Sequence, residues 1–317
     1  MHAERIGGSS QVKLLTQNDL PLSEETAVAI GLFDGIHAGH MALIHDIECQ
    51  TGLKSLVYTF DTKPNHTAYK NIYTAEEKAS IFASLNVDML YQQSFTREFS
   101  RLTKEAFMER IVKDMRARHI TVGFDFRFGR NAEGTAGYLQ EQAGRFGYTV
   151  CIVPAVKCGD GKISSTLIRG HIERGEMEQT ASLLGRFYFI DGKIEKGKHL
   201  GSSIGFPTAN ISTDKLLPRY GVYATIAQID GKCYPAVTNV GIKPTVSDAG
   251  VPNVETFIFD FSGDVYNEWM RVNFVSFLRG ERTFPNVDAL QKQIAQDAHL
   301  AYEMLRDLEV YKNHILW

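Results

Sequence analysis

The segment from residue 26 to residue 40 reads TAVAIGLFDGIHAGH and decides the fold of the first half of the chain. Its apolar first half predicts a short buried strand over residues 26–33 that ends in a glycine-rich turn. A helix is predicted over residues 40–50, because its apolar side chains cluster on one face, namely Met41, Leu43, Ile44 and Ile47. A buried strand, a glycine turn and a helix in this order are typical of an open α/β sheet.

The same alternation of strands and helices continues to about residue 156. Further strands are predicted over residues 54–60, 88–91, 120–124 and 149–156, and further helices over residues 74–86 and 103–118. Alternating elements of this kind favour a mainly parallel, doubly wound sheet with helices on both faces, which is a Rossmann-like α/β domain.

After about residue 186 the pattern changes to short β-rich runs. They cover residues 187–194, 221–229, 233–240, 254–261 and 270–277. Asp230-Gly231 predicts a two-residue hairpin, and a long amphipathic helix over residues 286–308 is capped by Asn286 or Asp288. The second half is therefore expected to be a small antiparallel β-barrel with a C-terminal helix, which gives two domains, 1–185 and 186–317.

Composition limits the function classes. The chain has 317 residues, of which 44% are hydrophobic and 22% charged, as in ordinary globular proteins of two domains. Its net charge of −3 lacks the basic excess of a nucleic-acid-binding protein, and no apolar run is long enough for a membrane helix. The four cysteines form no CxxC pair, and the N-terminus carries no apolar signal-peptide core, so we expect reduced thiols and a cytoplasmic location.

The turn over residues 31–40 is the first candidate site. Gly31, Gly35 and Gly39 let the backbone approach a phosphate, and the N-terminus of the following helix offers unpaired N–H groups to an anion. His37 and His40 lie three residues apart and project to one side of the helix start, where they donate hydrogen bonds to a phosphoryl oxygen. The alternative interpretation is a metal-binding pair or two packed histidines.

Two further segments point to the same crevice. Residues 162–169, KISSTLIR, precede a helix and combine hydroxyls with a cation, which suits the β- and γ-phosphates of a nucleoside triphosphate, although a simple helix cap is the alternative. Residues 123–129, GFDFRFG, place Asp125 and Arg127 after a strand end, although their aromatic neighbours are also consistent with a core.

The densest motif of the second half is GKHLGSSIGFPTAN, residues 197–210. Its glycines free the backbone to wrap phosphates. Thr208 and Asn210 offer the hard oxygen ligands that Mg²⁺ accepts. The alternative is a glycine-rich β-turn bent at Pro207.

Glu255 lies in the predicted strand VETFIFDF. Strand alternation places Val254, Thr256 and Ile258 on one face, with Glu255 and the phenylalanines on the other. A carboxylate among aromatic side chains is costly unless it has partners, so Glu255 is the candidate general base. The alternative is a salt bridge at the mouth of the barrel.

Taken in order, F33-D-G-x-H-x-G-H40, G123-F-D-F-R-F-G129 and I163-S-S-T-x-I-R169 resemble the adenylyltransferase half of prokaryotic bifunctional riboflavin kinase/FAD synthetases, over residues 15–185. The resemblance implies transfer of AMP from ATP to the phosphate of FMN, giving FAD and pyrophosphate, with His37 and His40 as catalytic residues. It also implies nucleotide-binding roles for Gly31, Phe33, Asp34, Gly35, Gly39, Asp125, Ser165, Thr166 and Arg169.

Two positions depart from that pattern. The family usually has Pro-His-Pro after the Thr-Phe strand, whereas this chain has Thr62-Lys63-Pro64, so Lys63 replaces the histidine expected near the triphosphate. Leu167 replaces the first arginine of Ser-Ser-Thr-Arg-Ile-Arg and removes one cation. Both departures predict weaker adenylylation or an altered choice of substrate.

The second half resembles the riboflavin kinase module of the same family over residues 183–310. The resemblance is carried by LGRFY (184–188), GFPTAN (205–210), GVY (221–223), NVGIKPT (239–245), the strand around Glu255 and FLRGE (277–281). It implies that Thr208 and Asn210 hold Mg²⁺-ATP, that Glu255 activates the ribityl 5′-hydroxyl, and that Arg279 lies near the flavin or the hinge of the lid. It also implies nucleotide-binding roles for Gly197, Gly205 and Pro207.

The leading hypothesis is an enzyme that phosphorylates riboflavin to FMN and adenylylates FMN to FAD, with Mg²⁺ required and ATP as co-substrate. Its partners are these small molecules, with no nucleic acid and no membrane, and the sequence predicts no particular oligomeric state. Two alternatives stay open: a riboflavin kinase whose N-terminal domain only binds nucleotide, and a non-catalytic flavin-sensing regulator.

Overall fold

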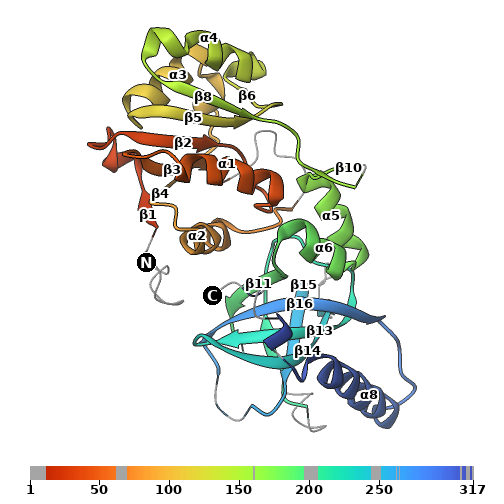
Figure 1. Cartoon of the computed structure of the whole chain (residues 1–317). Coiled ribbons are helices and arrows are strands. Elements are labelled where there is room, and N and C mark those ends of the chain that lie inside the picture. The colour runs from red at the N-terminus through yellow and green to blue at the C-terminus, as the bar shows by residue number, and fades with distance from the viewer. Residues whose placement is uncertain are drawn as a thin grey trace. The chain divides into compact units, whose positions relative to one another are not determined.

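A computed structural model of the chain describes residues 12–61, 70–159, 161–195, 206–243, 251–261, 263, 265–307, 309–311 and 315. Contacts divide these residues into two compact units, which Figure 1 shows in one view. The N-terminal unit contains residues 12–61 and 73–165, and the C-terminal unit contains residues 70–72 and those from Thr166 onward. The domain boundary between residues 185 and 186 stays a prediction.

The N-terminal unit is built on a six-stranded sheet in the order β1-β4-β3-β2-β5-β8, and every neighbouring pair is parallel. The strands are β1 (Lys13–Leu15), β2 (Thr26–Ile30), β3 (Lys54–Phe60), β4 (Met89–Gln93), β5 (Ala117–Gly123) and β8 (Thr149–Val153). The helices are α1 (Ala38–Glu48), α2 (Ala75–Ser84), α3 (Lys104–Lys113) and α4 (Ala136–Phe146). Short hairpins join β6 (Arg127–Phe128) to β7 (Gly134–Thr135) and β9 (Lys157–Cys158) to β10 (Gly161–Lys162).

Helices cover both faces of this sheet, as predicted. The apolar cluster beneath α3 and α4 joins Phe107, Ile111 and Leu139 to strand residues such as Ile30 and Tyr58. On the opposite face, α1 lies against β2, β3, β5 and β8, and its Asp46 accepts hydrogen bonds from β5. Figure 1 shows α3 and α4 on one side of the strands and α1 and α2 on the other. The doubly wound α/β architecture is confirmed.

Helix α3 is shorter than predicted, and helices α4 and α6 (Met177–Leu184) were not predicted. The helix expected to reach residue 118 ends at Lys113, because Arg116 takes a left-handed φ of 50° and β5 begins at Ala117. Helix α4 was not predicted, since Gly137 and Gly144 weaken its helical propensity. It forms nevertheless between a Thr135 cap and Gly147 in the left-handed conformation, and buries Leu139.

The C-terminal unit contains a second six-stranded sheet, antiparallel throughout, in the order β11-β16-β13-β14-β15-β12. The strands are β11 (Tyr188–Lys193), β12 (Ala209–Ile211), β13 (Gly221–Ile229), β14 (Lys232–Lys243), β15 (Val251–Ile258) and β16 (Trp269–Gly280). The predicted Asp230-Gly231 hairpin is confirmed, because both residues take positive φ angles between paired strands β13 and β14.

The two ends of this sheet approach each other and close it into the predicted small barrel. Glu195, just beyond β11, forms a bridge with Asn210 of β12, and its N–H donates to the Asn210 carbonyl at 2.9 Å. Gly192 permits the approach, since a Cβ there would lie 2.2 Å from Cγ2 of Ile211. Helix α8 (Val287–Leu305) begins at the predicted cap Asn286 and packs Ala298, Ala301 and Leu305 into the barrel core.

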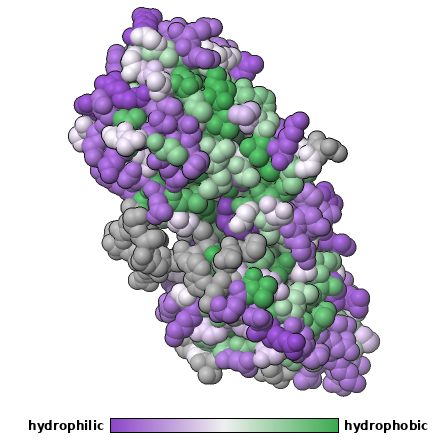
Figure 2. Space-filling view, viewed as in Figure 1, coloured by the Kyte–Doolittle hydropathy of each residue, from purple (hydrophilic) through white to green (hydrophobic). Residues whose placement is uncertain are grey.

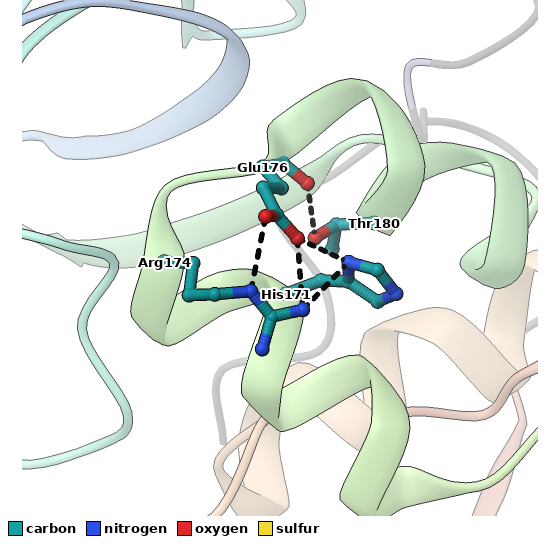
Figure 3. A network of polar contacts seen from close by, with 4 residues as sticks. All are labelled: His171, Arg174, Glu176 and Thr180. Atoms are coloured by element: carbon teal, nitrogen blue, oxygen red, sulfur yellow. Dashed lines mark hydrogen bonds and ion pairs between the residues drawn. The ribbon is translucent and has the colours of Figure 1, made fainter.

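Helices α5 (Ser165–Arg174) and α6 (Met177–Leu184) meet at a tight junction that the barrel holds. Figure 3 shows Glu176 in contact with both His171 and Arg174 at this junction. Gly175 has a left-handed φ of 78°, and a Cβ on it would lie 3.1 Å from the Tyr223 hydroxyl. The Arg219 N–H donates to the Ile172 carbonyl, so backbone hydrogen bonding also ties α5 to the barrel.

No helix among the described residues combines the length and the apolar character needed to span a membrane. The four cysteines are unpaired, as expected. Figure 2 shows hydrophobic side chains reaching the surface of the N-terminal unit on the face in view, between hydrophilic regions.

Candidate active sites

The glycine-rich turn lies where the order of the parallel sheet reverses. The chain leaves central strand β2, adds β3 and β4 on one side, and then returns to place β5 on the other side of β2. The turn after β2 and the segment after β5 therefore leave the carboxyl ends of two neighbouring strands in different directions. Open parallel sheets bind their ligands at this point.

The backbone of the turn is unusual. Phe33, Gly35 and Ile36 take positive φ angles of 47°, 92° and 45°. Two neighbouring contacts fix this conformation: the Gly31 N–H donates to the Tyr58 carbonyl at 3.2 Å, and the Thr59 hydroxyl donates to the Leu32 carbonyl at 3.0 Å. Such backbone conformations are sparsely populated, so they persist only where the surrounding packing imposes them. They are concentrated at functional sites.

The two histidines come together at the start of α1. Their rings stack with centroids 3.8 Å apart and planes 16° from parallel, and the His37 N–H donates to His40 Nδ1 at 3.3 Å. Gly39 leaves room for this stack, because a Cβ there would lie 3.1 Å from Cε1 of His37. Lone pairs of stacked rings lie in nearly parallel planes and do not converge on one ion. This geometry disfavours a metal-binding pair, and it is consistent both with paired hydrogen-bond donors and with two packed histidines.

The second motif contacts the first within the N-terminal unit. The Ser165 hydroxyl donates to the carbonyl of Asp34 at 2.7 Å, and Asp34 is buried. On α5, Thr166 is exposed and Arg169 is buried. The segment therefore does more than cap its own helix, since it also fixes the backbone of the glycine turn.

Asp125 follows β5, as predicted, and its partner is Lys162 of the second motif. The Lys162 ammonium lies 2.6 Å from Oδ2 of Asp125 and 4.5 Å from the ring centroid of Phe124. Phe124 and Leu32 are exposed by 48% and 41%, which is high for large apolar side chains. The alternative of a packed aromatic core holds for Phe128, which is buried, and fails for Phe124.

The kinase candidates meet on neighbouring strands of the barrel. Asn210 of β12 stands directly opposite Glu255 of β15 in the antiparallel register. The side-chain nitrogen of Asn253 lies between them, 3.0 Å from Oδ1 of Asn210 and 2.7 Å from Oε1 of Glu255. Thr208 is linked to the same group, since its carbonyl accepts from the Asn210 amide at 3.4 Å.

The two faces of β15 differ as strand alternation predicts. Thr256 points into a buried row of hydroxyls with Thr238, at 2.9 Å, whereas half-buried Glu255 shares the opposite face with Phe257. The ring of Phe206 packs edge-on against Phe257, with centroids 5.2 Å apart. Among the described residues no cation forms an ion pair with Glu255, which disfavours the alternative of a structural salt bridge.

Comparison with known proteins identifies a family for each half of the chain. A family model of FAD synthetase matches residues 20–167, and a model of riboflavin kinase matches residues 184–305. A bifunctional riboflavin kinase/FMN adenylyltransferase from Listeria monocytogenes is 36% identical over 85% of this chain and 89% of its own length. The chain belongs to the bifunctional riboflavin kinase/FMN adenylyltransferase family.

Two further relatives extend this comparison. The bifunctional riboflavin kinase/FMN adenylyltransferase of Bacillus subtilis is 32% identical over 90% of this chain and 94% of its own length. A crystal structure described as a macrolide-efflux protein from Streptococcus pneumoniae superimposes with a TM-score of 0.81 and 31% identity, over 92% of this chain and 98% of that one. That name refers to efflux, whereas the family models that match this chain are those of FAD synthetase and riboflavin kinase.

Some predicted residues lie outside the description. Gly197, Gly205 and Lys63 fall among residues that the structure does not describe. Pro207 is exposed two residues before β12, and Leu167 is 38% exposed on α5. The roles assigned to these residues stay predictions.

Arg279 makes contacts that the family resemblance did not indicate. Its guanidinium forms a forked ion pair with Asp297 of α8, as short as 2.6 Å, and both side chains are largely buried. Gln293 donates to the same carboxylate at 2.9 Å. Arg279 therefore fixes α8 to β16, which accords with a place at the hinge of the lid, while its flavin-binding role stays a prediction.

A cavity at the opposite edge of the N-terminal sheet is a poor candidate for either reaction. Its volume is about 500 Å³, and it is lined by Glu24, Glu25, Gly52, Leu53, Lys54 and Asp88 at the amino ends of the strands. Three carboxylates repel a triphosphate, and parallel sheets bind ligands at their carboxyl ends. The glycine turn and the segment that follows β5 lie at the carboxyl ends of the strands instead.

Neither the place of Asn253 in the site nor an individual role for Lys162 was predicted from the sequence. Asn253 was detectable, because it precedes Glu255 by two residues and alternation places both on one strand face. Lys162 begins the second motif, but its ion pair with Asp125 joins residues far apart in the chain. That pairing depends on the folded arrangement of β5 and β10.

Proposed function

We propose that this bifunctional riboflavin kinase and FMN adenylyltransferase of FAD biosynthesis performs its reactions at two separate sites. Riboflavin is phosphorylated at the Asn210–Glu255 site of the barrel, and FMN is adenylylated at the glycine turn that carries His37 and His40. The observation that supports this division is that His37 and His40 stack within the N-terminal unit, whereas Asn210 and Glu255 are paired within the C-terminal unit.

For the kinase reaction, Glu255 accepts the proton of the ribityl 5′-hydroxyl while the oxygen attacks the γ-phosphorus of ATP. The residues around it fit a magnesium ion: Asn210 and Thr208 supply hard oxygen atoms, and the buried Oδ1 of Asn253 has no hydrogen-bond partner among the described residues. When bound, Mg²⁺ neutralises charge on the transferred phosphoryl group. Thr208 and Asn210 are the proposed ligands.

For adenylylation, a phosphate oxygen of FMN attacks the α-phosphorus of ATP, and pyrophosphate leaves. His37 and His40 donate hydrogen bonds to the charge that develops on phosphate oxygens. The N-terminus of α1 adds N–H groups directed at the same region. The glycine turn holds these donors in place before the substrates bind.

The test is a pair of variants assayed with separated flavin products. Glu255→Gln should lower FMN formation from riboflavin by about 100-fold or more, because the amide accepts no proton, and should leave FAD formation from supplied FMN nearly unchanged. His37→Ala should have the reverse effect. If either substitution removes both activities from a folded protein, the assignment of one reaction to each site is wrong.

The unsubstituted chain separates the alternatives. FMN formation without FAD formation would favour a kinase whose N-terminal domain only binds nucleotide, as Lys63 and Leu167 suggest. No consumption of ATP with riboflavin would favour the non-catalytic regulator. Formation of both products, in the order FMN and then FAD, supports the proposal.

A further inference from the structure

Asn253 occupies the centre of the kinase site. It is 4% exposed, and its side chain lies on the same face of β15 as Glu255. One nitrogen atom, Nδ2, donates both to Oδ1 of Asn210 and to Oε1 of Glu255, at 3.0 and 2.7 Å. The side chain therefore connects a proposed metal ligand on β12 with the proposed base on β15.

The two hydrogen bonds use both protons of the amide nitrogen, which fixes the rotation of the amide plane. The Asn253 oxygen is buried and has no hydrogen-bond partner among the described residues. Buried acceptors of this kind are rare and call for an explanation, such as an ion or a water bound at the site. What distinguishes Asn253 is that its amide nitrogen donates to two proposed functional side chains, whereas the buried amide nitrogen of Asn273 donates to a backbone carbonyl.

We propose that Asn253 is a positioning residue for riboflavin phosphorylation. Its amide nitrogen holds the carboxylate of Glu255 and the side-chain oxygen of Asn210 in a fixed relation, so that the hydroxyl to be deprotonated and the metal-bound phosphate meet in the reactive geometry. This inference rests on the roles of Glu255 and Asn210 given under the proposed function.

The first test compares substitutions that differ in hydrogen bonding. Asn253→Ala removes the donor and should lower kcat for FMN formation by about 10- to 100-fold, with a smaller change in the KM for riboflavin. Asn253→Asp keeps the shape of the side chain but removes the donor at neutral pH. It should lose at least as much activity, because two carboxylates then face each other.

The division of the loss between kcat and KM separates positioning from packing. Loss of an orienting hydrogen bond should lower kcat for FMN formation in both N253A and N253D, and should change the KM for riboflavin and for ATP much less. A loss that falls mainly on KM, or a wild-type kcat in N253A, would overturn the proposal.

Asn273→Ala is the matched control. Asn273 is a fully buried asparagine of the same barrel, its nitrogen donates to the Ile226 carbonyl at 3.1 Å, and its oxygen has no partner among the described residues. This variant should lower the melting temperature about as much as N253A and leave kcat and KM of FMN formation unchanged. FAD formation from supplied FMN checks that each variant is folded.

A double-mutant cycle supplies a readout besides activity. Because Asn253 and Glu255 share a short hydrogen bond, the losses of melting temperature in N253A and Glu255→Ala should be non-additive, and N253A should slow FMN formation little further in the E255Q background. Additive losses would contradict the inference. If E255Q keeps full kinase activity, the proposed role of Glu255 is wrong and the proposed function fails. If E255Q is inactive but N253A is fully active, the proposed function stands and only the positioning role of Asn253 is wrong.

Discussion

The two candidate sites place their functional groups by different means. In the N-terminal unit the groups follow the ends of parallel strands, on a turn whose residues Phe33, Gly35 and Ile36 have positive φ angles. In the C-terminal unit they project from the strands themselves, where Asn210 stands opposite Glu255 in the β12–β15 register. One site is set by local backbone conformation, and the other by the pairing of strands distant in sequence.

This difference determines which substitutions damage each reaction. A site on a turn depends on the φ and ψ angles of a few residues, so it tolerates substitutions at other positions of the sheet that carries the turn. A site on strand faces depends on the register, and hence on every contact that closes the barrel. Glycine substitutions test both dependences, because glycine is required for a close approach in one unit and for a positive φ in the other.

The largest effect is expected at Gly192, where β11 meets β12. Gly192→Ala places a Cβ 2.2 Å from Cγ2 of fully buried Ile211, so the strands must separate at a cost of about 1–3 kcal/mol in the free energy of unfolding. Since β12 carries Asn210, FMN formation should fall by about 100-fold. FAD formation from supplied FMN should persist. Calorimetric unfolding and the two product assays measure these effects.

Gly280→Ala is the control for this prediction. Gly280 ends β16 in the same sheet, and a Cβ on it would meet nothing within 4 Å. This variant should unfold like the wild type. Equal FMN formation in G192A and G280A would show that barrel closure does not set the kinase geometry.

A smaller effect is expected at Gly35, in the turn after β2. Gly35 has a φ of 92°, so Gly35→Ala should cost about 1 kcal/mol in stability and slow FAD formation by about 10-fold as the turn relaxes. FMN formation should be unchanged. Gly147→Ala is the matched control, because Gly147 has a φ of 71° with open space around it and ends α4. If both variants slow FAD formation equally, backbone strain in the turn has no special role.

The sequence predicted most of the frame that carries both sites. Periodicity located β3 at residues 54–60 without error, and the strand, turn and helix over residues 26–50 agree with β2 and α1 to within a few residues. The apolar pattern of these elements reflects which of their side chains are buried, and the structure confirms that most of these side chains are buried. Strand alternation likewise predicted the face of β15 that carries Glu255.

What escaped prediction depends on tertiary structure. Helix α4 contains two glycines, and its stability comes from burying Leu139 and Ala136 in the core. The partners of Arg279 and Lys162, which are Asp297 and Asp125, come from other elements of the fold. The sequence indicated which side chains were candidates for function, but it did not indicate which of them would be in contact in the folded chain.

The smallest effect is expected at the α5–α6 junction, between the two regions that match the family models. Hydrogen bonds from Arg174 and His171 lower the pKa of Glu176 to about 2, and Figure 3 shows both contacts. Because the folded-state pKa lies below the unfolded value of about 4.3, this carboxylate stabilises the fold above that value. Its contribution disappears as the pH falls from about 4.5 towards about 2.

Glu176→Gln should therefore lower the melting temperature at neutral pH and lose less stability than the wild type on acidification. Glu178→Gln, which changes an exposed carboxylate of α6, should follow the wild-type curve. Melting temperatures between pH 2 and pH 7 check both expectations. The contrast between the sites also predicts that E176Q changes neither product at neutral pH, because the junction is neither the turn after β2 nor part of the β12–β15 register. A selective loss of FAD or FMN would show that one site depends on this junction as well.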